Sequence, residues 1–539
     1  MHSLAKKLIK TELKQRREEG CDVDAIADRI AAALADGASE QMFSALYDEL
    51  MALPVSDAFP YVEPSELAEI QAQRPGADSP ATFQWHDDIA LDRIYGGWLG
   101  RAAGCCLGKP VEGWRRDRIE KYLSERNALP LSDYIPFAEN MIAARLKPST
   151  RGNIHCMDRD DDMDFPVLGL LALERKGNGT SARTIANTWV SRIPFAQTYT
   201  AEGVAYRNFA LGIWPPQSAI YRNPFREWIG AQIRADIFGY VMPGRPAKAA
   251  ALAFADASVS HDKNGIYGEM LVAAMVAAAF VSGSIDDIVN AGLAQIPARC
   301  RLAEAVRNTQ QWCRDELAGE APAWQQVWSQ IEQHYGHYHG VHTINNAAVV
   351  VMSLYFGAED YEAGIVSSVL AGWDTDCNAA TVGSILGVKF GAKALPQKWT
   401  GVLNDRLLSD VRGEADNKIS DLAARTVVVA QAMSRDAAHV KPVGLAGEAS
   451  GIWELETGWG AQLLKLSEGT VYMVDNDLGP FALSACSLEA GELKFSFAID
   501  KGDWDFTADF EGRLDGDTIE GSYYPGVVPV TGRRMSHAE

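Results

Sequence analysis

Residues 158–174 read Asp158-Arg-Asp-Asp-Asp-Met-Asp164 followed by Phe165-Pro-Val-Leu-Gly-Leu-Leu-Ala-Leu-Glu174, so a dense acidic run leads into an apolar segment. Pro166 suits the first turn of a helix, and acidic residues stabilise a helix N-terminus. The pattern predicts a buried helix over 165–174 that opens from an acidic loop. Five aspartates in seven positions repel one another, which a folded protein relieves by protonation or by a bound cation. Taken alone, the run also fits a solvated loop that caps the helix.

A second acidic group, Asp374-Thr-Asp376, lies between Gly372-Trp373 and a small-residue segment at 378–390 that we expect to be helical. Here too carboxylates precede a helix. Hard divalent ions such as Mg²⁺ or Ca²⁺ prefer oxygen ligands of this kind. Capping is again the alternative, although the adjoining tryptophan and glycine favour a built site. We expect the two acidic loops to converge on cations.

A stripe of glycines, Gly96, Gly100, Gly104 and Gly108, recurs once per helical turn and would let another backbone approach closely. No strand precedes it, so a dinucleotide-binding glycine loop is a poor match. Alanine-rich helical patterns broken by glycine and proline fill residues 91–435, and period-2 patterns are scarce there. The predicted fold is therefore mainly α, with an all-helical central domain. Its clearest helical segments are 165–174, 268–281, 345–356, 361–371 and 378–390.

Two further regions flank this domain. Residues 1–50 are amphipathic and helical in pattern, and 51–90 are rich in proline, so 1–90 is predicted to be a helical extension and linker. Beyond Lys441 apolar residues alternate at period 2 between turn signals. We expect residues 445–539 to form a small antiparallel β domain, either a barrel or a sandwich.

Bulk properties narrow the class of protein. The chain has 539 residues and a formal net charge of −21, which argues against binding nucleic acid or an anionic membrane through bulk electrostatics. The most apolar stretch, 270–281, is too short to span a bilayer. Eight cysteines without a CxxC pair indicate reduced thiols and a cytoplasmic protein. Nothing in the sequence indicates an oligomeric state.

Over roughly residues 91–400 the chain resembles the ADP-ribosylglycohydrolase superfamily, an all-helical fold with a two-magnesium site. The family begins with a glycine-rich helix that ends at a loop glutamate, here Gly96 to Glu112. A Thr-Asp-Asp type run follows, here 160–162, and a Gly-Gly-Asp-Thr-Asp-Thr motif closes the pattern, here 372–377. All three occur in the family's order.

The resemblance implies specific roles for these residues. Metal ligands would be Asp160, Asp161, Asp162, Asp374 and Asp376. A catalytic carboxylate would come from Glu112, Asp162 or Asp376. Substrate contacts are assigned to His261, Asn208, Asn346 and Trp373, although a histidine such as His261 equally fits a core or capping role.

This sequence departs from the family pattern at several positions. Met163 and Cys377 stand where family members have threonines, and Cys105 follows Gly104 where an aspartate is common. A thioether is a poor Mg²⁺ ligand and a thiol prefers softer metals, so we expect one of the two Mg²⁺ sites to be weakened, rearranged or lost.

The implied activity is metal-dependent hydrolysis of an N- or O-glycosidic bond at the anomeric carbon of an ADP-ribosyl or related ribosyl group, on a small molecule or an ADP-ribosylated substrate. Two alternatives stay open. One is a non-catalytic protein that binds ADP-ribose or a nucleotide on the same fold. The other is a structural protein whose acidic loops only cap helices.

Overall fold

The computed structural model describes residues 4–76, 83–439, 451–458, 460–466, 469–473, 478–500, 505–524 and 528–535. The chain divides into two compact units, Met1–Met433 and Ser434–Glu539. The predicted start of the β domain at residue 445 lies outside the described residues.

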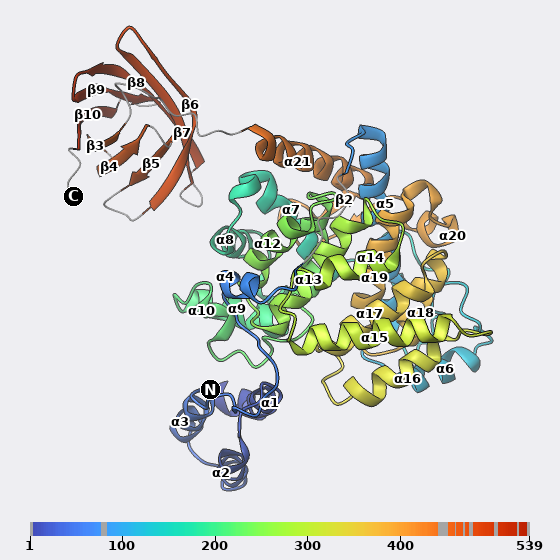
Figure 1. Cartoon of the computed structure of the whole chain (residues 1–539). Coiled ribbons are helices and arrows are strands. Elements are labelled where there is room, and N and C mark those ends of the chain that lie inside the picture. Colours follow the sequence, from blue (N-terminus) through green and yellow to red (C-terminus); the bar gives the residue numbers. More distant parts are fainter. Residues whose placement is uncertain are drawn as a thin grey trace. The chain divides into compact units, whose positions relative to one another are not determined.

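The first unit begins with three helices, α1 (Leu4–Glu18), α2 (Asp24–Ala35) and α3 (Glu40–Met51), which enclose a small apolar cluster of their own (Figure 1). The proline-rich segment that follows contains one short helix, α4 (Leu67–Ala72). Within the described residues 4–50, the amphipathic pattern therefore corresponds to helices, as predicted.

The helical body contains α5 (Asp87–Gly108), α6 (Arg116–Ser124), α7 (Asp161–Lys176), α8 (Ala182–Arg192), α9 (Thr200–Ala210), α10 (Gln217–Ile220), α11 (Asp236–Tyr240), α12 (Pro246–Ala257), α13 (Asn264–Ala279), α14 (Ile285–Leu293), α15 (Arg301–Leu317), α16 (Trp324–Tyr335), α17 (Thr343–Phe356), α18 (Tyr361–Leu370), α19 (Thr375–Phe390), α20 (Gln397–Thr400) and α21 (Ile419–His439). A two-stranded antiparallel sheet of β1 (Arg406–Leu408) and β2 (Asp416–Lys418) adds the only strands among the described residues of this body.

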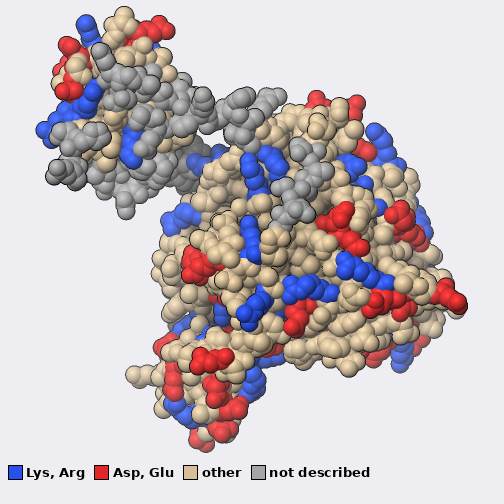
Figure 2. Space-filling view, viewed as in Figure 1, with Lys and Arg blue, Asp and Glu red and all other residues tan. Residues whose placement is uncertain are grey.

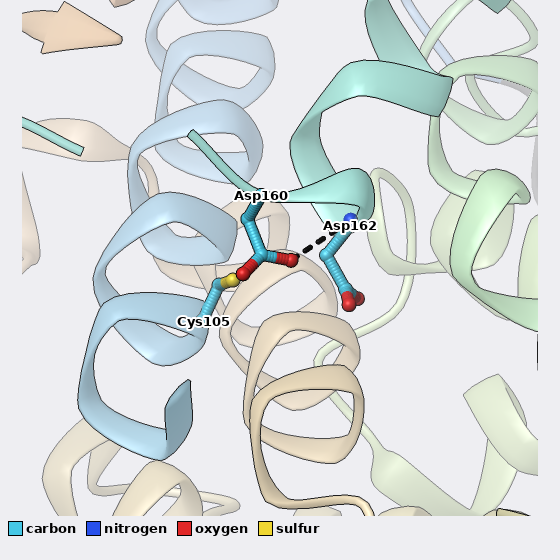
Figure 3. Close-up of side chains that lie close together, drawn as sticks. All are labelled: Cys105, Asp160 and Asp162. Carbon is cyan, nitrogen blue, oxygen red and sulfur yellow. Dashed lines mark hydrogen bonds between the residues drawn. The ribbon is translucent and has the colours of Figure 1, made fainter. Parts of the chain in front are cut away.

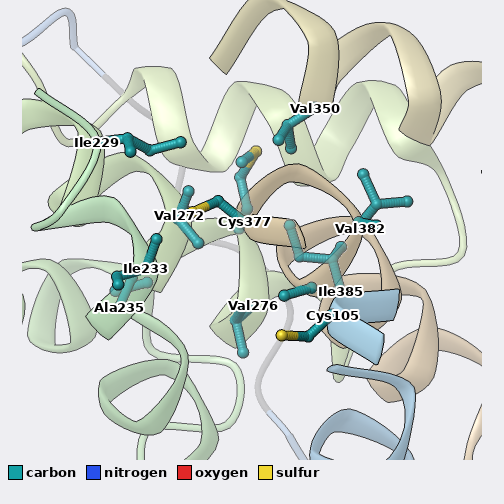
Figure 4. Packing of buried hydrophobic residues seen from close by; sticks show 14 of the residues in the cluster. Cys105, Ile229, Ile233, Ala235, Val272, Val276, Val350, Cys377, Val382 and Ile385 are labelled. Carbon is teal, nitrogen blue, oxygen red and sulfur yellow. The ribbon is translucent and has the colours of Figure 1, made fainter. Parts of the chain in front are cut away.

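Helix α13 lies at the centre of the apolar core. Its side chains are apolar on nearly all faces and every residue in it is buried, as expected for a helix surrounded by others. Figure 4 shows Val272 and Val276 of α13 close to Val350 of α17 and Ile385 of α19. This core fixes the helices that carry the acidic runs.

The glycine stripe of α5 packs against α19. A Cβ added at Gly104 would lie 2.0 Å from the backbone oxygen of Ala379, and one at Gly100 would lie 2.2 Å from that of Gly383. Gly108 faces Thr375 in the same way, so the helices run antiparallel with their backbones in direct contact. The stripe's predicted role, close approach of a second backbone, is confirmed.

The second unit is a closed antiparallel barrel. Its strands are β3 (Ile452–Thr457), β4 (Gly460–Lys465), β5 (Thr470–Met473), β6 (Leu478–Glu489), β7 (Glu492–Asp500), β8 (Asp505–Asp515), β9 (Thr518–Tyr524) and β10 (Val528–Arg534). They pair in chain order, and β10 closes onto β3. Aromatic side chains, including Trp453, Phe495, Phe497 and Tyr523, fill the interior. Of the two predicted β architectures, the barrel is the one formed.

Acidic and basic side chains are interspersed on the face of the molecule in Figure 2, and acidic ones gather on the N-terminal helices. None of the described helices combines the length and apolarity required to cross a bilayer. All eight cysteines are free thiols.

Candidate active site

Both acidic runs begin helices whose N-termini meet at one place. Asp160 is the N-cap of α7, where its side chain accepts a 3.0 Å hydrogen bond from the amide of Asp162. Helix α7 thus starts four residues before the predicted 165, because the aspartates form its first turn instead of a preceding loop. Asp374 is the N-cap of α19, yet its side chain makes no capping hydrogen bond. Capping therefore accounts for Asp160 and leaves the carboxylate of Asp374 without that role.

The two helix starts open onto a cavity of about 360 Å³. Carboxylates, cations, aromatic rings and aliphatic side chains all contribute to its lining. The lining residues are Lys109, Glu112, Arg145, Leu146, Arg159, Asp160, Asp161, Asp162, Tyr199, Thr200, Glu202, Trp228, Ile229, Gly230, Ile233, Val341, Asp374, Asp376 and Cys377.

The carboxylates form three overlapping groups in which the potential ligand atoms lie within 4.8 Å of one another. The groups are Glu112 with Asp374 and Asp376, Asp162 with Asp376 and Cys377, and Cys105 with Asp160 and Asp162. Figure 3 shows the third group, in which the thiol of Cys105 on α5 approaches the carboxylate of Asp160. The structure therefore brings together residues that lie more than 200 positions apart in the sequence.

Two buried cationic side chains form ion pairs with some of these carboxylates. Arg101 donates to the backbone oxygen of Asp162 at 2.7 Å and forms ion pairs with Asp162 at 3.2 Å and Asp236 at 2.7 Å. Lys109 places its Nζ 3.2 Å from Asp160. In the described part of the chain, no ion pair reaches the carboxylates of Glu112, Asp374 or Asp376.

The carboxyl groups of the cluster lie close together with few cations nearby, and this raises the pKa values of several of them. Burial, reinforced by neighbouring carboxylates, raises the pKa of Asp161 and Asp376 well above the usual value for an aspartate. Glu112 is exposed at the rim, but desolvation of its carboxyl group in the cavity, with Asp374 and Asp160 nearby, raises its pKa to about 7. In the absence of a cation, these carboxyl groups therefore take up protons more readily than exposed ones do.

The residues present fit divalent cations. Ion pairs reach only Asp160 and Asp162 in this cluster, so among the described residues the carboxyl groups of Glu112, Asp161, Asp374 and Asp376 have no paired cation. Asp376 is 4% exposed and its Oδ1 has no hydrogen-bond partner among the described residues. A buried carboxylate oxygen without a partner is costly unless a cation meets it.

We expect Asp376→Asn to stabilise the metal-free protein. The change removes a charge that its neighbours repel and adds an amide that can donate to Asp374 or Glu112. The free energy of unfolding should rise by roughly 2 kcal/mol in EDTA. Thermal unfolding with and without Mg²⁺ checks this, since Mg²⁺ should raise the melting temperature of the parent far more than that of the variant. A variant less stable than the parent in EDTA would contradict it.

Asn346 and Trp373, both predicted to contact substrate, lie at the Asp374 loop but do not line the cavity. The Oδ1 of Asn346 accepts from the Nδ2 of Asn378 at 2.8 Å and from the amide of Asp374 at 3.4 Å. Trp373 lines a separate hollow of about 290 Å³ with Trp328. Both residues are therefore placed to hold the loop in position.

His261 and Asn208 are also outside the cavity lining. His261 is 1% exposed and its Nδ1 lies 2.8 Å from the hydroxyl of Ser260. Asn208 is fully buried and donates to the backbone oxygens of Ser218 and Tyr221, both at 2.9 Å. Met163 is buried in the apolar core and does not line the cavity, whereas Cys377 does.

Sequence reasoning gave no role to Lys109, Arg101 or Trp228. Lys109 precedes Glu112 by three residues on the same exit from α5, which was an available signal. The sequence gave no signal for the role of Arg101, because a lone arginine inside a glycine-rich helix does not reveal which carboxylates it pairs with. The cavity wall also contains Trp228, whose ring stacks on that of His339 with centroids 4.2 Å apart.

A second buried charge cluster joins α1 to that wall. Arg226 pairs with Glu12 and Glu19, each at 2.8 Å, and the Nε2 of Gln15 donates to Glu227 at 2.5 Å. Although burial opposes it, the charge of Arg226 lowers the pKa of Glu19 below its usual value. Carboxylates of this cluster are thus satisfied, unlike those at the cavity.

The chain continues directly from this cluster into the cavity wall. Trp228, Ile229 and Gly230 line the cavity, and the amide of Ile229 donates to Val341, another wall residue, at 2.9 Å. Helix α1 therefore contacts the segment that continues into this part of the cavity wall.

We expect Glu19→Gln to destabilise the protein by about 3 kcal/mol, because it leaves buried positive charge with one partner fewer. Hydrogen exchange at the Ile229 amide should accelerate as the wall loosens. Glu49→Gln in α3 is the matched control, because the pair of Glu49 with Arg29 is exposed and screened by solvent, so its loss should leave stability nearly unchanged. Equal effects of the two changes on unfolding and exchange would contradict the role given to α1.

Comparison with known proteins gives three findings. The family model described as ADP-ribosylglycohydrolase matches residues 86–436. A protein of Archaeoglobus fulgidus described as uncharacterized is 24% identical over 333 residues, which cover 61% of this chain and 96% of that protein. A solved structure titled "ADP-ribosylglycohydrolase-related protein complex" is 15% identical with a TM-score of 0.41, over 64% of this chain and 99% of that one.

Proposed function

The chain belongs to the ADP-ribosylglycohydrolase family, and on that basis we propose that it is a metal-dependent hydrolase that cleaves an N- or O-glycosidic bond at the anomeric carbon of an ADP-ribosyl or related ribosyl substrate. The observation that carries the proposal is the convergence of Glu112, Asp160–Asp162, Asp374 and Asp376 on one cavity with too few cations to neutralise them. A glycosidic bond breaks through a transition state with positive charge on the sugar, which a carboxylate cluster stabilises.

Asp161, Asp162, Asp374 and Asp376 would hold the metal ions, which we take to be Mg²⁺. Asp160, the fifth predicted ligand, caps α7 and pairs with Lys109, so it contributes less free charge. When bound, the ions would orient the ribose hydroxyls and lower the pKa of a water molecule.

Glu112 is our first choice for the general base. It lies at the cavity rim, and its pKa of about 7 allows it to accept a proton near neutral pH. Asp162 and Asp376 are second choices, because both are deeply buried and each belongs to two of the three groups that could hold a cation, whereas Glu112 belongs to one.

The rest of the lining suits an anionic substrate that carries a ring. Arg145 is exposed at the cavity and makes no ion pair in the part of the chain that the structure describes. Tyr199 and Trp228 offer ring faces on the same lining. These groups support phosphate and base contacts for an ADP-ribosyl group, free or attached to a protein. The eight free cysteines support a cytoplasmic location.

The test is a substrate panel with the full-length protein. ADP-ribosyl-arginine, ADP-ribosyl-serine, O-acetyl-ADP-ribose and simple ribosides are incubated with Mg²⁺ or with EDTA, and released ADP-ribose or ribose is measured by mass spectrometry. We expect turnover of at least one ADP-ribosyl substrate that EDTA abolishes and Mg²⁺ restores. Turnover that is insensitive to EDTA would remove the metal from the proposal.

The second candidate is a non-catalytic protein that binds ADP-ribose. The observation that favours it is Cys377, whose thiol donates to Asp162 at 3.2 Å where the family pattern has a threonine. Calorimetry with ADP-ribose, with and without Mg²⁺, combined with the panel above separates the two. Tight binding of ADP-ribose with every substrate of the panel left intact would favour the second candidate.

A further inference from the structure

The carboxylate cluster contains a thiol in a position to bind a cation. Cys377 lies in the first turn of α19, lines the cavity, and has its Sγ 3.2 Å from the Oδ2 of Asp162. Its Sγ and carboxylate oxygens of Asp162 and Asp376 all lie within 4.8 Å of one another. Three ligand atoms from two helices therefore converge on one point.

An independent observation marks that point as a cation site. Asp376 is 96% buried, and its Oδ1 meets no hydrogen-bond donor among the described residues. Arg101 reaches the other carboxylate of the group, Asp162, but does not pair with Asp376. One oxygen of the triplet is thus left for a ligand.

The ligand atoms at this point differ in kind from those of the neighbouring carboxylate group. The group of Glu112, Asp374 and Asp376 offers oxygen alone, which suits a hard ion such as Mg²⁺. The group of Asp162, Asp376 and Cys377 adds sulfur, which Mg²⁺ binds poorly and Zn²⁺ binds well. The two groups share Asp376 and are otherwise unlike.

The dimensions also suit zinc. Bonds of about 2.3 Å to sulfur and about 2.0–2.2 Å to oxygen place two tetrahedral ligand atoms roughly 3.5 Å apart, close to the 3.2 Å between Cys377 and Asp162. All three residues line the cavity, so the site is next to the space where substrate would bind. Three protein ligands and one open position are typical of a catalytic zinc site.

We propose that Asp162, Asp376 and Cys377 form a mixed sulfur–oxygen site that selects Zn²⁺ or a similar borderline ion, beside an all-oxygen site for Mg²⁺. The inference rests on the proposed metal dependence and adds the identity of one ion. As the sulfur binds the ion, the thiol proton passes to solvent.

The other nearby thiol serves as the internal control. Cys105 approaches Asp160, but both oxygens of that carboxylate are already engaged, Oδ1 by the amide of Asp162 and Oδ2 by the ammonium of Lys109 at 3.2 Å. Cys105 also does not line the cavity. The site therefore depends on Cys377 and not on Cys105.

Cobalt substitution in the full-length protein tests the proposal. The protein is stripped with EDTA, supplied with Mg²⁺, and titrated with Co²⁺ while the near-ultraviolet thiolate-to-cobalt charge-transfer band is recorded. We expect the band in the parent and in Cys105→Ser, and its loss in Cys377→Thr. Zn²⁺ affinity should fall at least about tenfold in Cys377→Thr while Mg²⁺ still raises its melting temperature. Cys377→Ser is the second variant, and it must lose the band as well.

Three outcomes would overturn the proposal. Co²⁺ bound without a charge-transfer band would exclude the sulfur ligand, and a band that persists in both Cys377 variants would place the thiolate elsewhere. Both results leave the metal-dependent hydrolase untouched if Mg²⁺ still binds and supports turnover. Failure of the parent to bind Mg²⁺, Co²⁺ and Zn²⁺ would overturn this proposal and the proposed metal dependence together.

Discussion

Asp374→Ala should abolish Mg²⁺ binding and turnover while leaving the fold in place. The carboxylate of Asp374 faces Glu112 and Asp376 in the cavity and makes no capping hydrogen bond to α19. Its removal takes a ligand from the all-oxygen group, and the lost stabilisation of several kcal/mol corresponds to a roughly thousand-fold or larger fall in kcat/KM. Calorimetric titration with Mg²⁺ and release of ADP-ribose from the best substrate of the panel are the two measurements.

Asp360→Ala is the matched control for this experiment. Asp360 is also an N-cap aspartate, and its side chain accepts a 2.9 Å hydrogen bond from the amide of Glu362 at the start of α18, outside the cavity. Its loss should cost about 1 kcal/mol of stability and leave Mg²⁺ binding and turnover intact. If Asp374→Ala behaves like Asp360→Ala, the acidic loops are caps and the metal site is wrong.

Sequence patterns predicted the helices of this fold well, because helical periodicity is visible within a single stretch of the chain. The glycines of α5 recur once per turn, and the apolar run after Asp164 has no polar face, so helix and burial follow directly. The sequence did not predict which helix packs against the glycine stripe. Small residues indicate that another backbone approaches closely, but they do not identify it. That α19 fills this role, and thereby joins the two acidic runs, depends on tertiary packing.

The residues of the candidate site likewise include some that the sequence predicted and some that it did not. Both aspartate runs meet at one cavity, as a cluster of oxygen ligands at two helix starts predicts. The polar residues proposed to contact substrate, such as Asn208 and His261, are engaged in the interior, because an isolated polar residue carries no sign of whether it faces a ligand or a backbone group. Long-range partners such as Arg101 become visible only in three dimensions.

Gly104→Ala should destabilise the first unit and weaken metal binding, although alanine is the better helix former. Helix propensity alone favours the change by about 1 kcal/mol. Against this, the new Cβ would lie 2.0 Å from the backbone oxygen of Ala379, which no rotamer can relieve, and overpacking of this kind costs about 3 kcal/mol or more. The clash therefore outweighs the propensity gain. Because α19 must shift, the carboxylates of Asp374 and Asp376 at its start should separate from Glu112.

Chemical denaturation followed by the helical circular dichroism signal, together with Mg²⁺ titration, measures both effects. Gly179→Ala is the control, because a Cβ there meets nothing within 4 Å and its unfolding free energy should change by less than about 0.5 kcal/mol. Weaker Mg²⁺ binding in Gly104→Ala alone would tie the geometry of the cluster to the contact between α5 and α19. Unchanged stability and Mg²⁺ affinity in that variant would mean that the two backbones do not touch, and the convergence of the two acidic runs would lose its physical cause.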